Sequence, residues 1–285
     1  MQAIVVTGAS TGIGRSAVAR AVQAGAHVFP TVRSVADAES LTTEFGDRVE
    51  PLVMDVTSAA AIAAAAARVA EALKGRTLFG LVNNAGVAMP GPLPLLTTDD
   101  LRAQFETNLF GVHSVTRAFL PLLGTDRSRT GNPGRIVMIS SIGGRNGSPF
   151  VGPYAASKHA LEGYSQSLRR ELMLHGIKVI VIAPGSVVTP IWAKAESSGL
   201  NRFATTEYSP STQAAADYML GLGRAGLPAS VIGDAVWTAL SAASPRQRVT
   251  LVRNKFFTYT LLRLLPDAVM DWLIAKRMGL TQKPL

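Results

Sequence analysis

The sequence predicts a doubly wound parallel α/β sheet with helices on both faces, folded as a single domain over residues 1–285. Short β-branched runs alternate with longer helical patterns through the first 190 residues, which is the order of βαβ units. The runs IVV, IVMI and VIVI are apolar without alternation, as expected for strands covered on both faces. A chain of 285 residues with 47% hydrophobic content can build one full core of this size.

The strands and helices follow one another in a regular order. We expect strands at 3–6, from 27 onward, at 49–54, 78–82, 135–140 and 177–183. We expect helices at 14–24, 58–73, 98–123 and 153–175. Gly25 and Gly176 end two of these helices, and Ser58 is a good N-cap for another. Pro30 cannot donate to a strand ladder, so we expect it near a strand end or at a bulge.

Three segments depart from this rhythm. Residues 124–134, GTDRSRTGNPG, are polar and glycine-rich and predict an exposed loop. Residues 189–228 show only short helical patterns, which predicts a substrate lid over 190–228. Residues 254–285 are rich in leucine, aromatics and basic residues, and predict a C-terminal helical extension that starts near Pro266.

Charge and composition exclude several classes. There is no cysteine, which rules out disulfides and thiolate chemistry. Residues 246–285 hold eight Lys and Arg against two Asp, which is +6 of the net charge of +9. We expect this extension to cover the active-site mouth or make a contact in a homodimer or homotetramer; a membrane-surface contact stays as an alternative. No motif indicates nucleic-acid binding. No signal peptide or membrane span is expected, so we expect a soluble, cytoplasmic protein.

A glycine-rich turn follows the first strand and opens the first helix. It reads TGASTGIG, residues 7–14. Glycine at 8 permits the tight turn, glycine at 12 lets the backbone approach a pyrophosphate, and glycine at 14 lets helix pack on strand. Phosphates then bind at the helix N-terminus. We therefore expect a Rossmann-like dinucleotide site that includes Gly8, Ser10, Thr11, Gly12, Ile13 and Gly14.

The end of the second strand predicts which nicotinamide cofactor binds. An Asp or Glu at this position would hold the ribose 2′-hydroxyl of NAD, but the chain has Val32 followed by Arg33. A guanidinium makes charge-assisted bonds to a phosphate. We therefore expect NADP(H), with Arg33 at its 2′-phosphate.

These motifs together resemble the short-chain dehydrogenase/reductase family, in its compact single-domain branch. The matching stretches cover residues 1 to about 190 in the family's order: TGASTGIG, Asp55-Val56, Asn83-Asn84-Ala85-Gly86, Asn108, Ser141, YAASK at 154–158, and Pro184-Gly185 followed by Thr189. The loop between Asn108 and Ser141 is longer than usual. The C-terminal third is loosely similar to the subgroup that acts on steroid- or retinol-like substrates.

The resemblance implies a catalytic set of Asn108, Ser141, Tyr154 and Lys158. Tyr154 would exchange a proton with the substrate oxygen, and Ser141 would hydrogen-bond that oxygen. Lys158, one helical turn away, is expected to lower the pKa of Tyr154 and to bond the nicotinamide ribose. Asn108 would hold a water that links Lys158 to solvent.

The resemblance also assigns cofactor contacts beyond the glycine turn, to Asp55, Val56, Asn83, Ala85, Gly86, Tyr154, Lys158, Pro184, Gly185, Val187 and Thr189. Substrate contacts are expected from Ser141, Phe150, Tyr154 and Trp192, in an apolar pocket for a small lipophilic molecule. His159 and Glu162 are expected on the helix surface, and no metal site is expected.

The function predicted is hydride transfer between NADP(H) and a carbonyl or secondary alcohol. One alternative is a catalytically idle NADP(H)-binding sensor or scaffold, which the presence of Ser141, Tyr154 and Lys158 disfavours. Another is an epimerase or dehydratase of the related long branch, which would need more chain after residue 190.

Overall fold

The computed structural model describes residues 2–189, 191, 200–254, 259, 261 and 264–281. Within them, seven parallel strands form one sheet in the order β3-β2-β1-β4-β5-β6-β7. The strands are β1 Ala3–Val6, β2 His27–Val32, β3 Leu52–Val53, β4 Gly80–Asn83, β5 Arg135–Ile139, β6 Lys178–Pro184 and β7 Arg248–Leu251. The strand order reverses between β1 and β4, so the predicted doubly wound, single-domain fold is confirmed.

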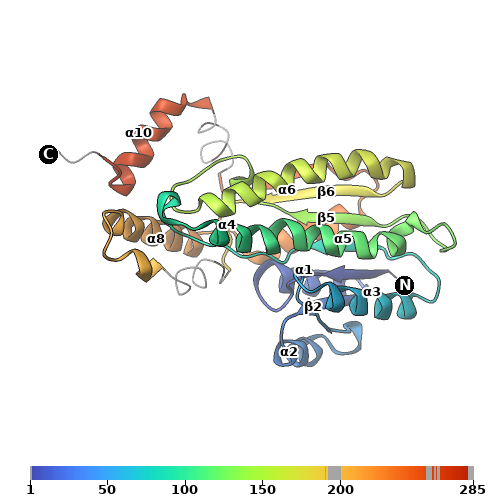
Figure 1. Cartoon of the computed structure of the whole chain (residues 1–285). Helices are drawn as coiled ribbons and strands as arrows, with labels where there is room; N and C mark the ends of the chain where they lie inside the picture. The colour runs from blue at the N-terminus through green and yellow to red at the C-terminus, as the bar shows by residue number, and fades with distance from the viewer. Residues whose placement is uncertain are drawn as a thin grey trace.

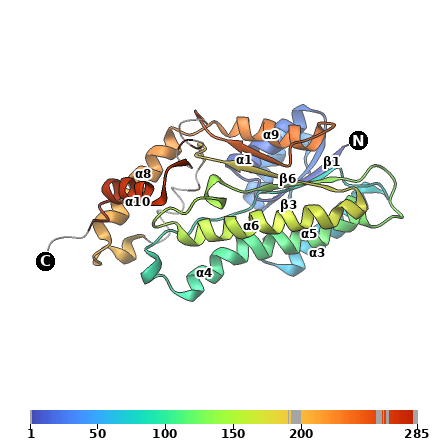
Figure 2. The same cartoon turned by 90° about the horizontal axis from the view of Figure 1, so that it is seen from above.

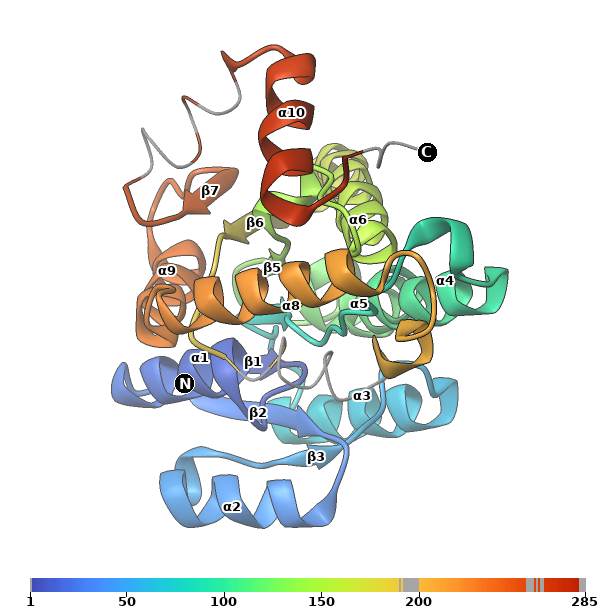
Figure 3. The same cartoon turned by 90° about the vertical axis from the view of Figure 1, so that its left-hand side faces the viewer.

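Helices cover both faces of the sheet (Figures 1 and 2). One face packs against α1 Gly12–Gln23, α2 Val35–Phe45 and α9 Ala229–Ser241. The other packs against α3 Ala59–Leu73, α5 Val112–Leu120 and α6 Gly152–Glu171. Figure 3 shows α8 Ser209–Arg224 crossing in front of the carboxyl ends of the strands, with α10 Asp267–Met278 beside it. Ligands of doubly wound sheets bind at this edge.

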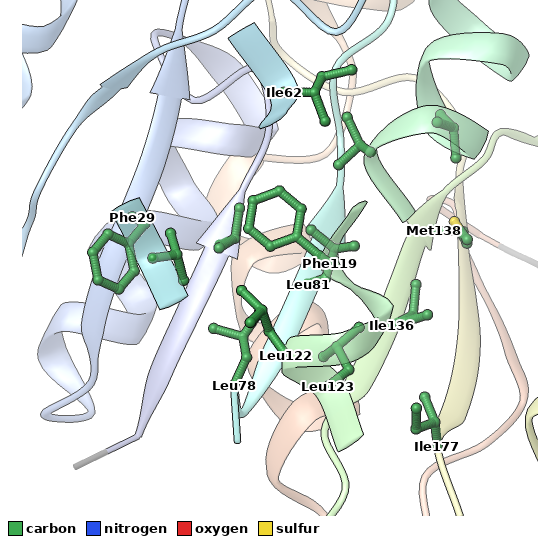
Figure 4. Packing of buried hydrophobic residues seen from close by; sticks show 14 of the residues in the cluster. Phe29, Ile62, Leu78, Leu81, Phe119, Leu122, Leu123, Ile136, Met138 and Ile177 are labelled. Carbon is green, nitrogen blue, oxygen red and sulfur yellow. The ribbon is translucent and has the colours of Figure 1, made fainter. Parts of the chain in front are cut away.

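Each face of the sheet has its own apolar core. Phe29, Leu81, Phe119, Ile136 and Met138 lie together beneath α3, α5 and α6 (Figure 4). Their side chains have at most 1% of their surface exposed. A second cluster lies under α1, α2 and α9. Strands buried on both faces explain why their sequences are apolar without alternation.

The helix boundaries follow the capping residues. The Ser58 hydroxyl accepts from the Ala61 N–H at 3.3 Å and starts α3, as predicted. After α6, a 3₁₀ turn over Leu172–His175 ends at Gly176, whose φ of 69° is in the left-handed region that favours glycine.

Pro30 lies inside β2, two residues before its end. The carbonyls of Val28 and Val32 accept from Glu50 and Met54, so this side of β2 faces β3. Pairing with β3 is interrupted there, between a bridge at Val49 and the short strand at Leu52–Val53. The missing N–H of Pro30 therefore falls where β3 makes no ladder bond. This interruption of the pairing also explains why β3 is shorter than predicted.

The helix expected over 98–123 is interrupted twice. After α4, Thr98–Phe105, the chain forms a π-helix over Glu106–Gly111 before α5, and another over Pro121–Thr125 after it. A π turn widens the backbone and is frequent at functional sites. The first of them carries Asn108.

The C-terminal third holds more regular structure than the sequence predicts. The region expected as a lid contains the 16-residue α8, and the chain adds α9 and the edge strand β7 beyond it. Residues 190 and 192–199 of the expected lid lie outside the described part. None of the described helices combines the length and apolar character needed to cross a bilayer.

Candidate active site

A cavity of about 670 Å³ opens at the carboxyl ends of the strands. The structure brings most of the predicted site residues to its wall: Gly8, Ser10, Thr11, Gly12, Ile13, Arg33, Asp55, Val56, Ala85, Gly86, Ser141, Tyr154, Lys158, Pro184, Gly185, Val187 and Thr189. They come from the segments at and just after the ends of β1 to β6, from the first turn of α1, and from α6, which carries Tyr154 and Lys158. The cavity spans the point where the strand order reverses, which suits a dinucleotide.

The glycine turn after β1 is shaped for close approach. Gly8 and Gly12 have φ values of 64° and 58°, which L side chains rarely adopt. A Cβ on Gly8 would lie 2.8 Å from the Ala85 Cα. The N-cap of α1, Thr11, makes no side-chain bond to the first turn, and that turn has no acidic residue. Its free N–H groups can therefore hold a phosphate.

Asn84, which the sequence analysis left out of the site, holds the glycine turn in place. Its side-chain nitrogen donates to the carbonyls of Thr7 and Gly8, both at 2.9 Å. The N–H groups of Asn84 and Ala85 donate to the Thr7 hydroxyl at 3.0 Å. These bonds cross from the end of β4 to the end of β1, over 75 residues in sequence, so local patterns could not reveal them.

Replacing Asn84 with alanine is expected to weaken dinucleotide binding by loosening this turn. Two hydrogen bonds are lost, each contributing about 0.5–1.5 kcal/mol. We expect a lower Tm and a several-fold higher Kd for NADPH, measured by nucleotide fluorescence. Gln213→Ala is the control, because it removes an exposed hydrogen bond from the Gln213 side-chain amide to Asp217 on α8. A wild-type Kd in Asn84→Ala would contradict this role.

The end of β2 forms the wall where a ribose 2′-group would lie. Val32 is buried and Arg33 is exposed beside it. Hydrogen bonds from Thr57 N–H and hydroxyl, at 2.9 and 2.7 Å, hold the pKa of Asp55 below its usual value, and the charge of Arg33 adds to this. Thr31 is 1% exposed, lines the cavity, and its hydroxyl has no hydrogen-bond partner. A buried unpartnered hydroxyl in a cavity fits a polar ligand there.

Ser141 and Tyr154 meet on the cavity wall. Ser141 caps the 3₁₀ turn Ile142–Gly144, and its hydroxyl accepts from the Gly143 N–H at 3.0 Å. The same side chain hydrogen-bonds to the Tyr154 phenol. A Cβ on Gly143 would lie 3.5 Å from the tyrosine ring, so a small residue here leaves room for the ring.

Lys158 is buried one turn further along α6. Its ammonium donates to the Ile139 carbonyl at 2.8 Å and lies 5.8 Å from the centre of the Tyr154 ring. Burial lowers the pKa of Lys158 to about 8, while the Glu162 carboxylate acts in the opposite direction. An ammonium held at neutral pH can bond a polar ligand and stabilise a phenolate.

The expected direction of the Tyr154 pKa is wrong for the unliganded protein. Burial raises the pKa of Tyr154, and the hydrogen bond with Ser141 only partly opposes this. Desolvation disfavours the charged phenolate. The i,i+4 spacing places the two groups correctly, but spacing gives no measure of burial.

Asn108 packs behind this pair and off the cavity wall. It is fully buried; its amide exchanges two hydrogen bonds with the backbone of Val87, at 2.9 and 3.0 Å, and donates to the Ser157 hydroxyl at 3.0 Å. Ser157 in turn donates to the Tyr154 carbonyl at 2.8 Å. Asn108 thus ties the π-helix to the turn of α6 that carries Tyr154.

Three further predicted residues are not on the cavity wall that the structure describes, and a fourth lies outside the described residues. Gly14 packs inside the glycine turn, where a Cβ would lie 2.6 Å from the Asn84 amide. Asn83 points to the opposite side and donates to Thr116 at 2.9 Å. Phe150 lies in a small cluster with residues of α8 and α10. Trp192 lies outside the described residues.

The other end of the cavity is apolar with one ion pair. Val87, Ala88, Met89 and Pro90 line it, together with Ile191, Asp100 and Arg202. Arg202 is bound to Asp100 at 3.0 Å, so its charge is neutralised. Among the described residues, no group of three or more His, Asp or Glu gathers in a way that could hold a metal ion.

Comparison with known proteins identifies the family. The family model for short chain dehydrogenases matches residues 2–199. The chain belongs to the short chain dehydrogenase family. The match ends where the sequence resemblance was expected to loosen.

Relatives of this short-chain dehydrogenase extend over almost its whole length. It is 34% identical over 284 residues to the NADPH-dependent 3-dehydrocapnine reductase of Ornithobacterium rhinotracheale, covering 99% of this chain and all of that protein. It is 33% identical to retinol dehydrogenase 16 of Homo sapiens over 94% of this chain and 87% of the relative. Human 17-beta-hydroxysteroid dehydrogenase type 6 is 31% identical, over 96% of this chain and 87% of the relative. The predicted likeness to the steroid and retinol subgroup is confirmed.

Solved structures agree with the fold. A short-chain dehydrogenase from Streptomyces avermitilis superposes with a TM-score of 0.75 at 30% identity, covering 97% of each chain. One from Burkholderia phymatum, in complex with NAD, has a TM-score of 0.79 at 23% identity over 100% of this chain and 97% of that one. Because its identity is only 23%, the Burkholderia phymatum structure supports the fold alone. The oxidoreductase family and the nucleotide-binding fold are thus established.

Proposed function

We propose that this short-chain dehydrogenase is an NADP(H)-dependent reductase of lipophilic ketones, or the dehydrogenase of the corresponding secondary alcohols. The observation that carries the proposal is the group of Ser141, Tyr154 and Lys158 on the cavity wall, where Lys158 is buried and the other two are half-buried. A panel of ketones and alcohols, followed at the NADPH absorbance, tests it. If none of these compounds is turned over, the alternative of a catalytically idle NADP(H)-binding protein is favoured instead.

The three side chains divide the chemistry of carbonyl reduction. NADPH, when bound, supplies the hydride. Ser141 donates a hydrogen bond to the substrate oxygen, where negative charge develops. Tyr154 gives its proton to that oxygen, and the Lys158 ammonium stabilises the phenolate that remains. The raised pKa of Tyr154 keeps the phenol protonated before reaction, as a general acid in the reductive direction requires.

The preference for NADP(H) is supported by the end of β2. Val32 cannot accept a ribose hydroxyl, and Arg33 is an exposed guanidinium on the cavity wall. A relative that is 34% identical is named as NADPH-dependent. The residues that would hold the cofactor are Gly8 to Ile13 at the phosphates, Arg33 at the 2′-phosphate, Asp55 at the adenine and Lys158 at the nicotinamide ribose.

A lipophilic substrate is supported by the apolar end of the cavity and by the neutralised Arg202. Burial contributes about 0.8 kcal/mol per CH₂, so three added carbons should raise kcat/KM by tens of fold. We expect this rise along a homologous series of neutral 2-ketones. Keto acids of equal length should be poorer substrates, since Arg202, the cation that lines this part of the cavity among the described residues, is already paired with Asp100. A flat series, or faster keto acids, would contradict the lipophilic pocket.

The Asp100–Arg202 pair provides a control on this series. Asp100→Asn frees the Arg202 charge while leaving the apolar wall unchanged. It should raise kcat/KM for keto acids and leave neutral ketones nearly unaffected. If kcat/KM changes equally for keto acids and neutral ketones, Arg202 does not face the substrate, and its pairing with Asp100 does not determine substrate choice.

The remaining assignments concern the C-terminal third and the assembly. We propose that 190–228 covers the substrate and that 254–285 contributes to a homodimer or homotetramer in the cytoplasm. Support for the assembly comes from exposed apolar side chains on α10, among them Trp272, which is 59% exposed. Such residues are usually covered by another surface. Sedimentation velocity of wild type and Trp272→Gln tests the assembly.

A further inference from the structure

Glu162 is a buried carboxylate that the chemistry above does not use. The sequence analysis expected it on the surface of α6, which is wrong, because only 5% of the residue is exposed. It lies one helical turn beyond Lys158, on the same buried side of α6. A buried charge is costly unless it is paired.

The partner of Glu162 comes from the distant edge strand β7. The Arg248 guanidinium donates to both carboxylate oxygens, at 2.9 and 3.1 Å. This two-pronged arrangement fixes geometry as well as charge. Arg248 also donates to the Thr250 hydroxyl at 2.5 Å and hydrogen-bonds to the Tyr259 phenol. Tyr259 is itself buried, so the pair anchors part of the C-terminal extension to the catalytic helix.

The turn that carries Ser141 packs directly on Glu162. A Cβ on Gly144 would lie 3.0 Å from the Glu162 Cγ and 3.0 Å from the Lys158 carbonyl. Arg145, which follows this turn, lies 4.0 Å from the carboxylate. Glu162 therefore touches the elements that hold Ser141 and Lys158, and meets the C-terminal third through Arg248.

We propose that Glu162, oriented by Arg248, is a positioning residue that keeps the Lys158 ammonium charged and correctly placed for the reaction. This rests on the role of Lys158 in the proposed function. A purely structural ion pair would join α6 to β7 without affecting the charge of Lys158. The two roles differ in what they do to the titration of Lys158.

The charged and titratable groups around Lys158 are few in the described part of the chain. Tyr154 and Glu162 lie one helical turn before and after it on α6. Arg248 from β7 and Arg145 from the turn after β5 contact Glu162, and Tyr259 hydrogen-bonds to Arg248. Of these, the Glu162 carboxylate is the one that raises the pKa of Lys158, against the lowering by burial to about 8. Removing the carboxylate should therefore let the ammonium lose its proton at lower pH.

The test follows Lys158 directly in the unliganded protein, by NMR titration of ε-¹³C-labelled lysine. Ordinary lysines titrate at about 10.4, so a midpoint near 8 stands apart, and Lys158→Met assigns it. Glu162→Gln should lower this midpoint by about one pH unit. Glu162→Asp keeps the charge and should stay near the wild-type midpoint. An unchanged midpoint in Glu162→Gln overturns the proposal.

Two further variants separate charge from stability. Glu162→Gln/Arg248→Met removes both buried charges, so its Tm should recover relative to Glu162→Gln, and its midpoint should lie between those of Glu162→Gln and the wild type because the opposing Arg248 charge is also gone. Phe119→Leu, on the buried side of α5, should lower Tm without moving the midpoint. If Phe119→Leu shifts the midpoint as far as Glu162→Gln does, the pair acts only through stability and the proposal fails. Since no turnover is measured, failure here is distinct from failure of the reductase assignment.

Discussion

Replacing Tyr154 with phenylalanine is expected to lower kcat/KM for ketone reduction by about 10²–10⁴-fold, the usual contribution of a general acid. The substitution removes the phenolic proton donor and its hydrogen bond with Ser141, and leaves the ring in place. NADPH binding should stay nearly intact, because Lys158 keeps its bond to the Ile139 carbonyl. Steady-state kinetics and nucleotide fluorescence measure the two effects separately.

Tyr164→Phe is the matched control for this variant. Tyr164 lies on the same helix and its phenol is 3.2 Å from His113, away from the cavity. The Tyr164→Phe substitution should change kcat/KM for ketone reduction only slightly. Lys158→Met, in contrast, should damage both turnover and NADPH affinity, because two roles are proposed for that ammonium. If Tyr154→Phe keeps more than a tenth of the wild-type rate, Tyr154 is not the proton donor.

A preference for NADPH over NADH of about 10- to 150-fold in Kd is expected, from one charge-assisted bond worth about 1.5–3 kcal/mol. The bond is that of Arg33 with the 2′-phosphate. Val32→Asp with Arg33→Ala should reverse the preference, since an aspartate at this place accepts from the ribose hydroxyl and repels the phosphate.

Arg48→Ala is the control for the cofactor variant. Arg48 is also exposed, and it donates to the Gly25 carbonyl rather than facing the cavity. Its loss should change the NADPH and NADH affinities equally. A wild-type protein that binds NADH as tightly as NADPH would contradict the assignment of Arg33.

Local patterns were sufficient wherever a single residue decides the backbone. Ser58 starts α3 through its own hydroxyl, and Gly176 supplies the left-handed turn after α6. The edge strand β7 was missed because its four residues, RVTL, are half-buried and form no long apolar run. The π turn around Asn108 was missed because it is fixed by contacts with Val87 and Ser157 rather than by helix propensity.

The site was predictable as a set of positions and less so as an environment. Motif spacing brought Ser141, Tyr154 and Lys158 to one cavity. The pKa of Tyr154 depends on burial, which spacing does not encode. Glu162 was assigned to the surface because its partner, Arg248, is 86 residues away in sequence. Long-range pairs of this kind emerge only from the packed fold.

If the protein moves a hydride from NADPH to a ketone carbon with Tyr154 as proton donor, a deuterium on the cofactor must appear on the carbinol carbon of the product. The most direct measurement supplies 2-decanone and NADPH deuterated at the reactive C4 position, and analyses the alcohol by mass spectrometry. Wild type is expected to give 2-decanol with one deuterium on the carbinol carbon, and Tyr154→Phe at equal NADPH saturation to give almost none. Absence of labelled alcohol with wild type, across this ketone and its longer homologues, would contradict the account.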